Sequence, residues 1–282
     1  MSPQYGNEKE VGDGLQLALK QGVIKSRSDV WITSKLWNTY HAAEHVPQAL
    51  AKTLEDLQTD YVDLYLVHFP IALKFVPFET RYPPEWVHDP EGPNPRMEMA
   101  RVPFSETWGA MEDLANSGKT RNIGVCNMAS AQLRDLLSYA SIPPSVLQIE
   151  RHALLQQHRL LRMCREEGIV VTGFSPLGAS SYVELDMATP QQSALREPLV
   201  EAIAARHGKT AAQVLLRWGI QSGTSIIPKT VKPQRLLENL QIFDFSLSDE
   251  DMESIGTLDK SFRFNDPGDF CTGMGAFHPI YD

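Results

Sequence analysis

The chain has 282 residues, of which 42% are hydrophobic and 9% aromatic, and its formal net charge at pH 7 is -9. This composition suits a soluble globular protein. The negative charge argues against nucleic acid or an anionic membrane as the main partner. No apolar run reaches membrane-spanning length, and no signal peptide opens the sequence. Three cysteines without metal-binding spacing suit a reducing compartment, so we expect a cytoplasmic protein.

Two periodicities alternate along the chain. Short apolar runs rich in β-branched residues predict strands at residues 30–35, 62–68, 122–126, 146–150, 169–174 and 224–228. Segments with helical spacing predict helices at residues 8–21, 43–56, 104–116, 130–139, 158–167, 195–206, 210–221, 232–240 and 249–257. Ser248 is a good N-cap for the last of these helices, because acidic residues follow it in the first turn.

This alternation of strand and helix is typical of a parallel sheet covered by helices. No Gly-x-Gly-x-x-Gly follows a strand, so an open dinucleotide-binding sheet is not supported. We therefore predict an α/β fold of the (β/α)8 TIM-barrel type, forming a single domain over residues 1–282. Because the chain opens on a helix and shows six strands, we expect that the first strand–helix–strand of the barrel, about 45 residues, is not included in it.

Two stretches break the regular spacing. Residues 71–103 form a long proline-rich segment with Trp86, which is predicted to be a substrate-side loop. Residues 259–282 show no helical period and are predicted to form a second substrate loop at the C-terminal end.

Three polar side chains are expected on one rim, since barrels place their active sites at the carboxyl ends of the strands. Lys35 ends the first predicted strand, His68 ends the second, and Tyr5 immediately precedes the first helix. Taken one at a time, Lys35 would be interpreted as a snorkelling lysine, His68 as a core histidine with satisfied hydrogen bonds, and Tyr5 as an ordinary N-terminal aromatic residue. Together they suit carbonyl reduction: a tyrosine hydroxyl donates the proton, an ammonium lowers the pKa of such a phenol, and a neutral histidine orients the carbonyl.

A second group of polar residues lies at the end of the last predicted strand. Lys229, Thr230 and Arg235 occupy the strand end and the start of the following helix, where barrels often bind phosphate. Two cations so close suit the 2′-phosphate of NADP. Standing alone, the pair would be interpreted as a solvated helix start.

At these residues the sequence resembles the aldo-keto reductases, and within them the yeast-type D-xylose (aldose) reductases. The resemblance runs from Ser2 to about Pro267, nearly the whole chain. Pro3-Gln-Tyr-Gly-Asn-Glu8 resembles the segment of the catalytic tyrosine, Ser34-Lys-Leu-Trp-Asn38 that of the lysine, and Leu66-Val-His-Phe-Pro-Ile71 that of the histidine. Phe75-Val-Pro77, Tyr82-Pro-Pro84 and Arg263-Phe-Asn-Asp-Pro267 are similar to the sugar-reductase branch.

The resemblance implies a role for each matching position. Tyr5, Lys35 and His68 become the catalytic residues, while Trp37 and Phe69 form walls of the carbonyl pocket and Asn265 contacts the substrate. The implied cofactor residues are Cys126, Asn127 and Gln148 beside the nicotinamide carboxamide, Phe174 on its ring, Ser175 and Leu177 at the pyrophosphate, Glu184 at the ribose, Lys229, Thr230 and Arg235 at the 2′-phosphate, and Glu238 and Asn239 at the adenine.

The sequence also departs from the family pattern. The family's catalytic aspartate, which pairs with the lysine, is expected just upstream of Ser2 and is not included in this chain. Cys126 stands where a serine is usual, and Phe174 where a tyrosine commonly stacks on the nicotinamide. Val231 replaces an asparagine that helps dual-specificity xylose reductases accept NADH, so NADPH is expected in preference to NADH.

The leading hypothesis is an NADPH-dependent reductase of a small sugar or aldehyde, of the D-xylose to xylitol type, as a monomer or homodimer. The alternative is a truncated, weakly active or non-catalytic NADPH-binding homologue with a regulatory role, as in potassium-channel β subunits. A metal-dependent hydrolase would need clustered histidine and carboxylate ligands at the strand ends, and the sequence offers too few.

Overall fold

The computed structural model describes residues 1–183 and 185–281, so the predicted ribose contact Glu184 lies outside the described residues. The chain divides into two compact units. One comprises Met1–Val146 and Pro267–Asp282, and the other comprises Leu147–Asp266. The single-domain interpretation stays a prediction, and the two units are described separately below.

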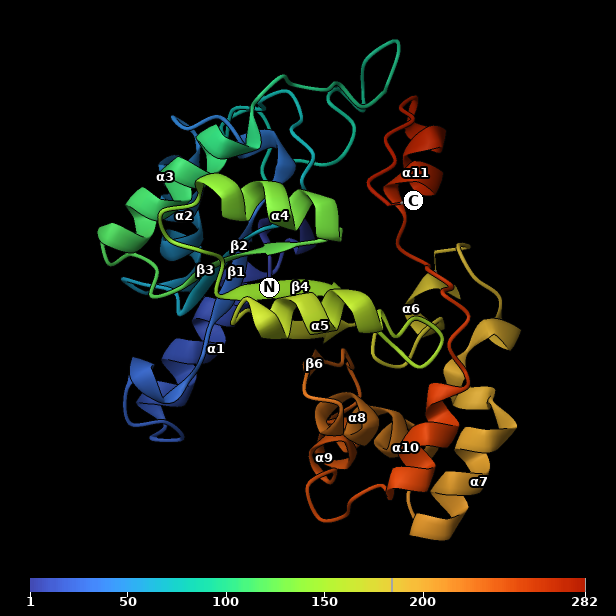
Figure 1. Cartoon of the computed structure of the whole chain (residues 1–282). Helices are drawn as coiled ribbons and strands as arrows, with labels where there is room; N and C mark the ends of the chain where they lie inside the picture. Colours follow the sequence, from blue (N-terminus) through green and yellow to red (C-terminus); the bar gives the residue numbers. More distant parts are fainter. Residues whose placement is uncertain (184, 282) are drawn as a thin grey trace. The chain divides into compact units, whose positions relative to one another are not determined.

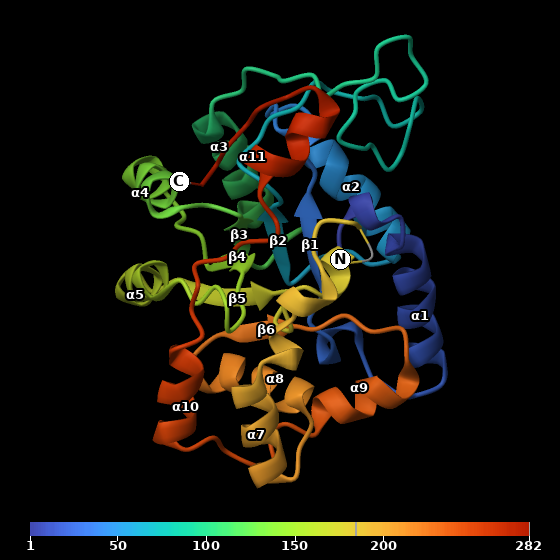
Figure 2. The same ribbon diagram turned by 90° about the vertical axis from the view of Figure 1, so that its right-hand side faces the viewer.

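The first unit contains parallel strands that follow one another in chain order. Its strands are β1 (Thr33–Leu36), β2 (Leu64–Val67) and β3 (Ile123–Cys126). Its helices are α1 (Glu8–Lys20), α2 (Val46–Leu57), α3 (Phe104–Asn116), α4 (Ser130–Tyr139) and α11 (Pro267–Phe270). Lys35 lies opposite Leu66, which lies opposite Gly124, so the three carboxyl ends share one edge (Figure 2). Every residue of β2 and β3 is buried, as expected for a parallel sheet covered on both faces.

The second unit has the same sequential order of strands. Its strands are β4 (Val146–Glu150), β5 (Val170–Phe174) and β6 (Ser225–Ile227), and β5 pairs with β6 in parallel. Its helices are α5 (His158–Glu166), α6 (Ser180–Val183), α7 (Pro198–His207), α8 (Ala211–Gln221), α9 (Pro233–Leu240) and α10 (Asp249–Gly256). Helices α7, α8 and α10 gather around a core that includes Val200, Val214, Trp218 and Ile255 (Figure 1).

Each predicted strand and helix is found, with shifts at some ends. The first strand begins at Thr33, because Arg27–Asp29 forms a short 3-10 helix and the backbone N–H of Ile32 bonds the Asp63 carboxylate at 2.9 Å. The tail, predicted without a helix, contains the four-residue helix α11, which is too short to show a period. No helix in the described part of the chain is both long and apolar enough to cross a bilayer.

The sequence also explains how α1 approaches α2. Gly12 lies on α1, where a Cβ atom would come within 2.3 Å of the backbone carbonyl oxygen of Asp56. Only a residue without a side chain fits at that distance. The helix that follows Tyr5 is therefore held closely against its neighbour.

Asp251 closes the first turn of α10 and confirms Ser248 as its N-cap. Ser248 Oγ accepts from the backbone N–H of Asp251 at 3.1 Å, and Asp251 Oδ2 accepts from that of Ser248 at 3.1 Å. The carboxylate also accepts from Arg206 and, at 2.8 Å, from His207 Nε2. Burial alone would raise the pKa of Asp251, but the bonds from His207, Ser248 and Arg206 lower it to about 2.

We expect Asp251→Asn to lower the free energy of unfolding near neutral pH by about 1 kcal/mol. This value is reduced for solvent screening because the Arg206 side chain is 57% exposed. Since the folded pKa is depressed, the stabilisation is present above the ordinary value of 3.8 and is lost as the pH falls through about 2. Urea unfolding at several pH values should show the two proteins converging in acid. A stability difference that persists in acid would contradict this interpretation.

Candidate active site

The first unit brings Tyr5, Lys35 and His68 together. Lys35 lies in β1, is 3% exposed, and donates from Nζ to the backbone oxygen of Met1 at 3.0 Å. Its Nζ atom is 5.3 Å from the centroid of the Tyr5 ring. Tyr5 ends the short 3-10 helix Pro3–Tyr5 just before α1, and its ring centroid lies 6.0 Å from that of His68. The three side chains thus converge from two strand ends and one helix start.

The environment of His68 keeps its imidazole neutral. The residue follows β2 and is 7% exposed, and its Nδ1 atom lies 3.2 Å from Ser2 Oγ. Burial, and then the nearby Lys35 ammonium, hold the pKa of His68 well below its usual range. A neutral ring keeps one N–H donor, so His68 is able to donate a hydrogen bond to a carbonyl oxygen at physiological pH.

Aromatic side chains surround this histidine. The Trp37 ring centroid is 5.2 Å from that of His68 and 5.0 Å from that of Trp86, which comes from the long loop 71–103. Trp86 also contacts Phe69 at 5.1 Å and the tail residue Phe270 at 5.3 Å. Trp37 Nε1 is buried and has no hydrogen-bond partner among the described residues. The site therefore has apolar walls and one indole N–H available to a polar substrate.

A buried carboxylate fixes the helix that follows Tyr5. Glu8 opens α1, is 3% exposed, and accepts hydrogen bonds from Ser34 Oγ in β1 and from Thr53 Oγ1 in α2, the latter at 3.0 Å. Burial raises the pKa of Glu8. Because Ser34 adjoins Lys35, Glu8 ties the segment that carries Tyr5 to the strand that carries the lysine.

Cys126 and Asn127 lie at the end of β3. Burial raises the pKa of Cys126 to about 12, so its thiol stays protonated. The Asn127 side chain donates from Nδ2 to the backbone oxygen of His68 at 2.9 Å, and its Oδ1 accepts from the Tyr281 hydroxyl at 3.3 Å. The predicted nicotinamide residue Asn127 is thereby joined to the His68 segment.

In the second unit, Glu150 fixes the segment that carries Asn265. Glu150 ends β4 and is fully buried. Its carboxylate accepts from the backbone N–H of Phe264 at 3.0 Å, from that of Asn265 at 2.8 Å, and lies 3.0 Å from His152 Nε2. The Asn265 Oδ1 atom is buried without a partner among the described residues.

The end of β5 turns sharply. Phe174 ends the strand and Ser175 follows with a φ of 51°, in the left-handed region. Ser175 Oγ lies 3.0 Å from the Tyr182 hydroxyl. At Gly178 the φ of 75° favours glycine. Gln148, within β4, is 6% exposed, whereas Phe174, Ser175 and Leu177 are half-buried.

The donor set at the start of α9 fits a phosphate group. Lys229 and Arg235 are exposed, and neither forms an ion pair with a residue that the structure describes. Thr230 Oγ1 accepts from the backbone N–H of Lys232 at 3.1 Å. Glu238 differs, because its carboxylate accepts from Thr210 Oγ1 at 2.7 Å and so faces α8. Asn239 is half-buried, and Val231 is 80% exposed.

Several contributors to the site were not found from the sequence. Trp86 was placed only within the predicted substrate-side loop, residues 71–103, and Phe270 and Tyr281 only within the predicted C-terminal substrate loop, residues 259–282. Glu150 gave a weak signal, since an acidic residue that ends a largely apolar strand needs buried donors. The contacts of the other three link segments far apart in the chain, and no local pattern reports them.

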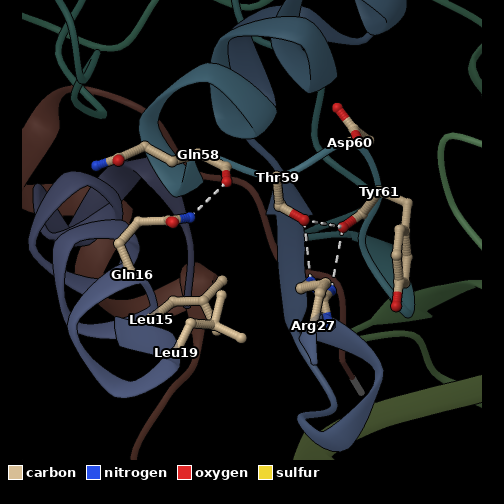
Figure 3. Close-up of a pocket in the computed structure, with 8 residues that line it drawn as sticks. All are labelled: Leu15, Gln16, Leu19, Arg27, Gln58, Thr59, Asp60 and Tyr61. Carbon is tan, nitrogen blue, oxygen red and sulfur yellow. Dashed lines mark hydrogen bonds between the residues drawn. The ribbon is translucent and has the colours of Figure 1, made fainter. Parts of the chain in front are cut away.

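A hollow of about 230 Å3 lies elsewhere in the first unit, beside the amino end of β2 (Figure 3). It is lined by Leu15, Leu19, Arg27 and neighbouring residues. Four of the five N–H donors of the Arg27 guanidinium are engaged, by Thr59 Oγ1 at 3.0 Å, the backbone oxygens of Val30 and Tyr61, and Asp63. With its cation already satisfied, and at the opposite ends of the strands from His68, this hollow is a structural feature of the helix–strand junction.

Comparison with known proteins establishes the family. The family model described as "Aldo/keto reductase family" matches residues 1–260, and the chain belongs to this family. It is similar to the NAD(P)H-dependent D-xylose reductase of Pachysolen tannophilus, with 49% identity over 93% of this chain and 82% of the relative. The corresponding protein of Scheffersomyces stipitis is 47% identical over 94% of this chain and 83% of the relative.

A solved structure agrees with this assignment. The aldose reductase from Schistosoma japonicum matches with a TM-score of 0.81 and 37% identity, over 93% of this chain and 79% of that one. The likeness confirms the predicted fold class, an α/β barrel of aldo-keto reductase type, of which the described residues supply the strands β1 to β6.

Proposed function

We propose that this protein uses NADPH to reduce the carbonyl group of an aldose or small aldehyde to an alcohol, as in the conversion of D-xylose to xylitol. The observation that carries the proposal is the convergence of Tyr5, Lys35 and the neutral His68 within one unit. The D-xylose reductases that share 47 to 49% identity with the chain support the substrate class.

Each member of the trio has a role in the proposed reaction. Tyr5 donates its hydroxyl proton to the carbonyl oxygen, and the Lys35 ammonium stabilises the phenolate that remains. His68 donates a hydrogen bond that orients the carbonyl and stabilises the charge developing on its oxygen. NADPH, when bound, supplies the hydride to the carbonyl carbon. Trp37 and Phe69 form apolar walls, and Asn265 contacts the substrate hydroxyls.

We propose that two groups of residues bind the cofactor, one at its nicotinamide end and one at its phosphate end. At the nicotinamide end, Asn127 and Gln148 bind the carboxamide beside Cys126, and Phe174 stacks on the ring. At the phosphate end, Ser175 and Leu177 contact the pyrophosphate, and the exposed cations Lys229 and Arg235, with Thr230, bind the 2′-phosphate. Glu238 and Asn239 are proposed near the adenine, and Glu184 near the ribose.

The test is turnover of D-xylose by the purified protein. We expect oxidation of NADPH that depends on D-xylose, with xylitol as product, and slower oxidation of NADH because Val231 offers no side-chain hydrogen bond at the 2′-position. Stoichiometric NADPH binding without turnover of any sugar or aldehyde would favour the regulatory alternative instead. Absence of both binding and turnover would overturn the proposal.

Replacing Lys229 by Ala is expected to affect the KM for NADPH and the KM for NADH differently. Loss of one charge-assisted hydrogen bond to phosphate corresponds to a rise in the KM for NADPH of about 10- to 100-fold. The KM for NADH, which has no 2′-phosphate, should change little. Lys232→Ala is the matched control, since Lys232 is also an exposed cation and was not predicted to contact cofactor. Equal losses for NADPH and NADH would contradict the assignment.

We propose a cytoplasmic location, supported by the cysteines. Cys126, Cys164 and Cys271 are all buried free thiols, which suits a reducing compartment. The oligomeric state, monomer or homodimer, stays a prediction.

A further inference from the structure

We propose that Tyr281 is a positioning residue for the cofactor, because its hydroxyl fixes the Asn127 amide that receives the nicotinamide carboxamide. The inference rests on the proposed function, which assigns Asn127 to the cofactor. It gives the tail beyond Asp266 a part in cofactor binding in addition to the expected contact with substrate.

The Asn127 side chain depends on its neighbours for its orientation. It directly follows β3 with a φ of 58°, a conformation that asparagine adopts more readily than most residues. The residue is only 2% exposed. Water therefore has little access, and a buried amide has to satisfy both its oxygen and its nitrogen with protein groups or ligand.

Two contacts hold the two ends of this amide. The backbone oxygen of His68 accepts from Nδ2 at 2.9 Å, which identifies the nitrogen end. The Tyr281 hydroxyl donates to Oδ1 at 3.3 Å and holds the oxygen end against rotation about the Cβ–Cγ bond. The partners are 59 and 154 residues away in the chain, so tertiary structure alone sets this geometry.

The remaining hydrogen-bonding capacity of Asn127 matches a primary carboxamide. An asparagine amide has two N–H donors and two acceptor lone pairs. Since the described residues engage one of each, one donor and one acceptor remain with respect to that part of the chain. The nicotinamide carboxamide offers the complementary acceptor and donor, and an amide already held in place loses less freedom when it binds.

The tail that carries Tyr281 is fastened to the long loop before it reaches Asn127. The backbone N–H of Met97 donates to the oxygen of Met274 at 2.9 Å, and the rings of Trp86 and Phe270 lie 5.3 Å apart. Ile280, beside Tyr281, is 9% exposed. The tail is thus held at Phe270, Met274 and Ile280, although Phe277 between them is 77% exposed.

The test compares two ligands by isothermal titration calorimetry. NADP+ contains the carboxamide, whereas adenosine 2′,5′-bisphosphate lacks the whole nicotinamide half. We expect Tyr281→Phe to weaken NADP+ binding by about two- to tenfold, the effect of one neutral hydrogen bond, and to leave the bisphosphate affinity unchanged. Tyr139→Phe is the control, since the Tyr139 hydroxyl is buried without a hydrogen-bond partner among the described residues. It should leave both affinities unchanged.

A double-mutant cycle isolates the contact. In the background of Asn127→Gly, which keeps the positive φ but removes the amide, Tyr281→Phe should have no further effect on NADP+ binding. If the Asn127→Gly protein does not fold, the comparison of Tyr281→Phe with wild type still tests the inference. Equal binding by wild type and Tyr281→Phe would overturn the inference, as would parallel losses for both ligands, or tighter NADP+ binding by the variant. A wild-type protein that does not bind NADP+ would overturn the proposed function and this inference with it.

Discussion

Tyr5→Phe is expected to lower kcat for D-xylose reduction by about 10²- to 10⁴-fold, the usual effect of losing a general acid. The phenyl ring keeps its place beside Lys35 and His68, so only the transferable proton is removed. Because Tyr5 is 57% exposed and its hydroxyl supports no other contact among the described residues, folding and NADPH affinity should change little. Steady-state kinetics with saturating NADPH, together with a binding titration, measure both quantities.

The control for this variant is Tyr61→Phe. Tyr61 lies near the amino end of β2, where its ring stacks against the guanidinium groups of Arg27 and Arg121 at 4.3 and 4.1 Å. Removing its hydroxyl should leave kcat unchanged. If Tyr5→Phe retained more than about a tenth of the wild-type kcat, Tyr5 would not be the proton donor.

Glu150→Ala is expected to lower the free energy of unfolding by about 3–5 kcal/mol. The substitution leaves the backbone N–H groups of Phe264 and Asn265 buried without an acceptor and removes the partner of His152. Urea unfolding gives the stability. The same variant should raise the KM for D-xylose, since the segment that carries Asn265 loses its anchor.

Two variants separate the role of this carboxylate from a general effect of substitution. Glu150→Gln retains an acceptor oxygen and should lose about 1 kcal/mol. Glu166→Ala removes a carboxylate on α5 whose only described partner is the exposed Arg162, and should lie within about 0.5 kcal/mol of wild type. A Glu150→Ala protein as stable as wild type would show that the Glu150 carboxylate contributes nothing to the free energy of unfolding.

Secondary structure followed from the sequence wherever a segment was long and periodic. Helices α3 and α4 and strand β4 have the predicted bounds. The errors occur where short-range geometry outweighs periodicity. Helix α7 begins at Pro198 rather than at Leu195, because Ala194–Arg196 forms a 3-10 helix and Pro198 takes the first helical position.

The site was predictable in part, where its residues lie on periodic strands. Lys35 lies near the carboxyl end of β1, and His68 directly follows β2, its parallel neighbour, so the strand pattern already placed them at one edge of the sheet. The contacts of Glu150 with Phe264 and of Tyr281 with Asn127 span 114 and 154 residues. Such contacts depend on where a non-periodic tail packs, and local propensity carries no information about that.

Trp86 has a consequence for engineering substrate preference. Its ring contacts Trp37 after β1, Phe69 after β2 and Phe270 in the tail, so three separate segments meet at one side chain. Substitutions in these segments are therefore coupled, and their effects on selectivity should not add. Exchange of the tail alone between related reductases would therefore transfer only part of the substrate preference. The loop and the tail contact each other through Trp86 and Phe270 and have to be exchanged together.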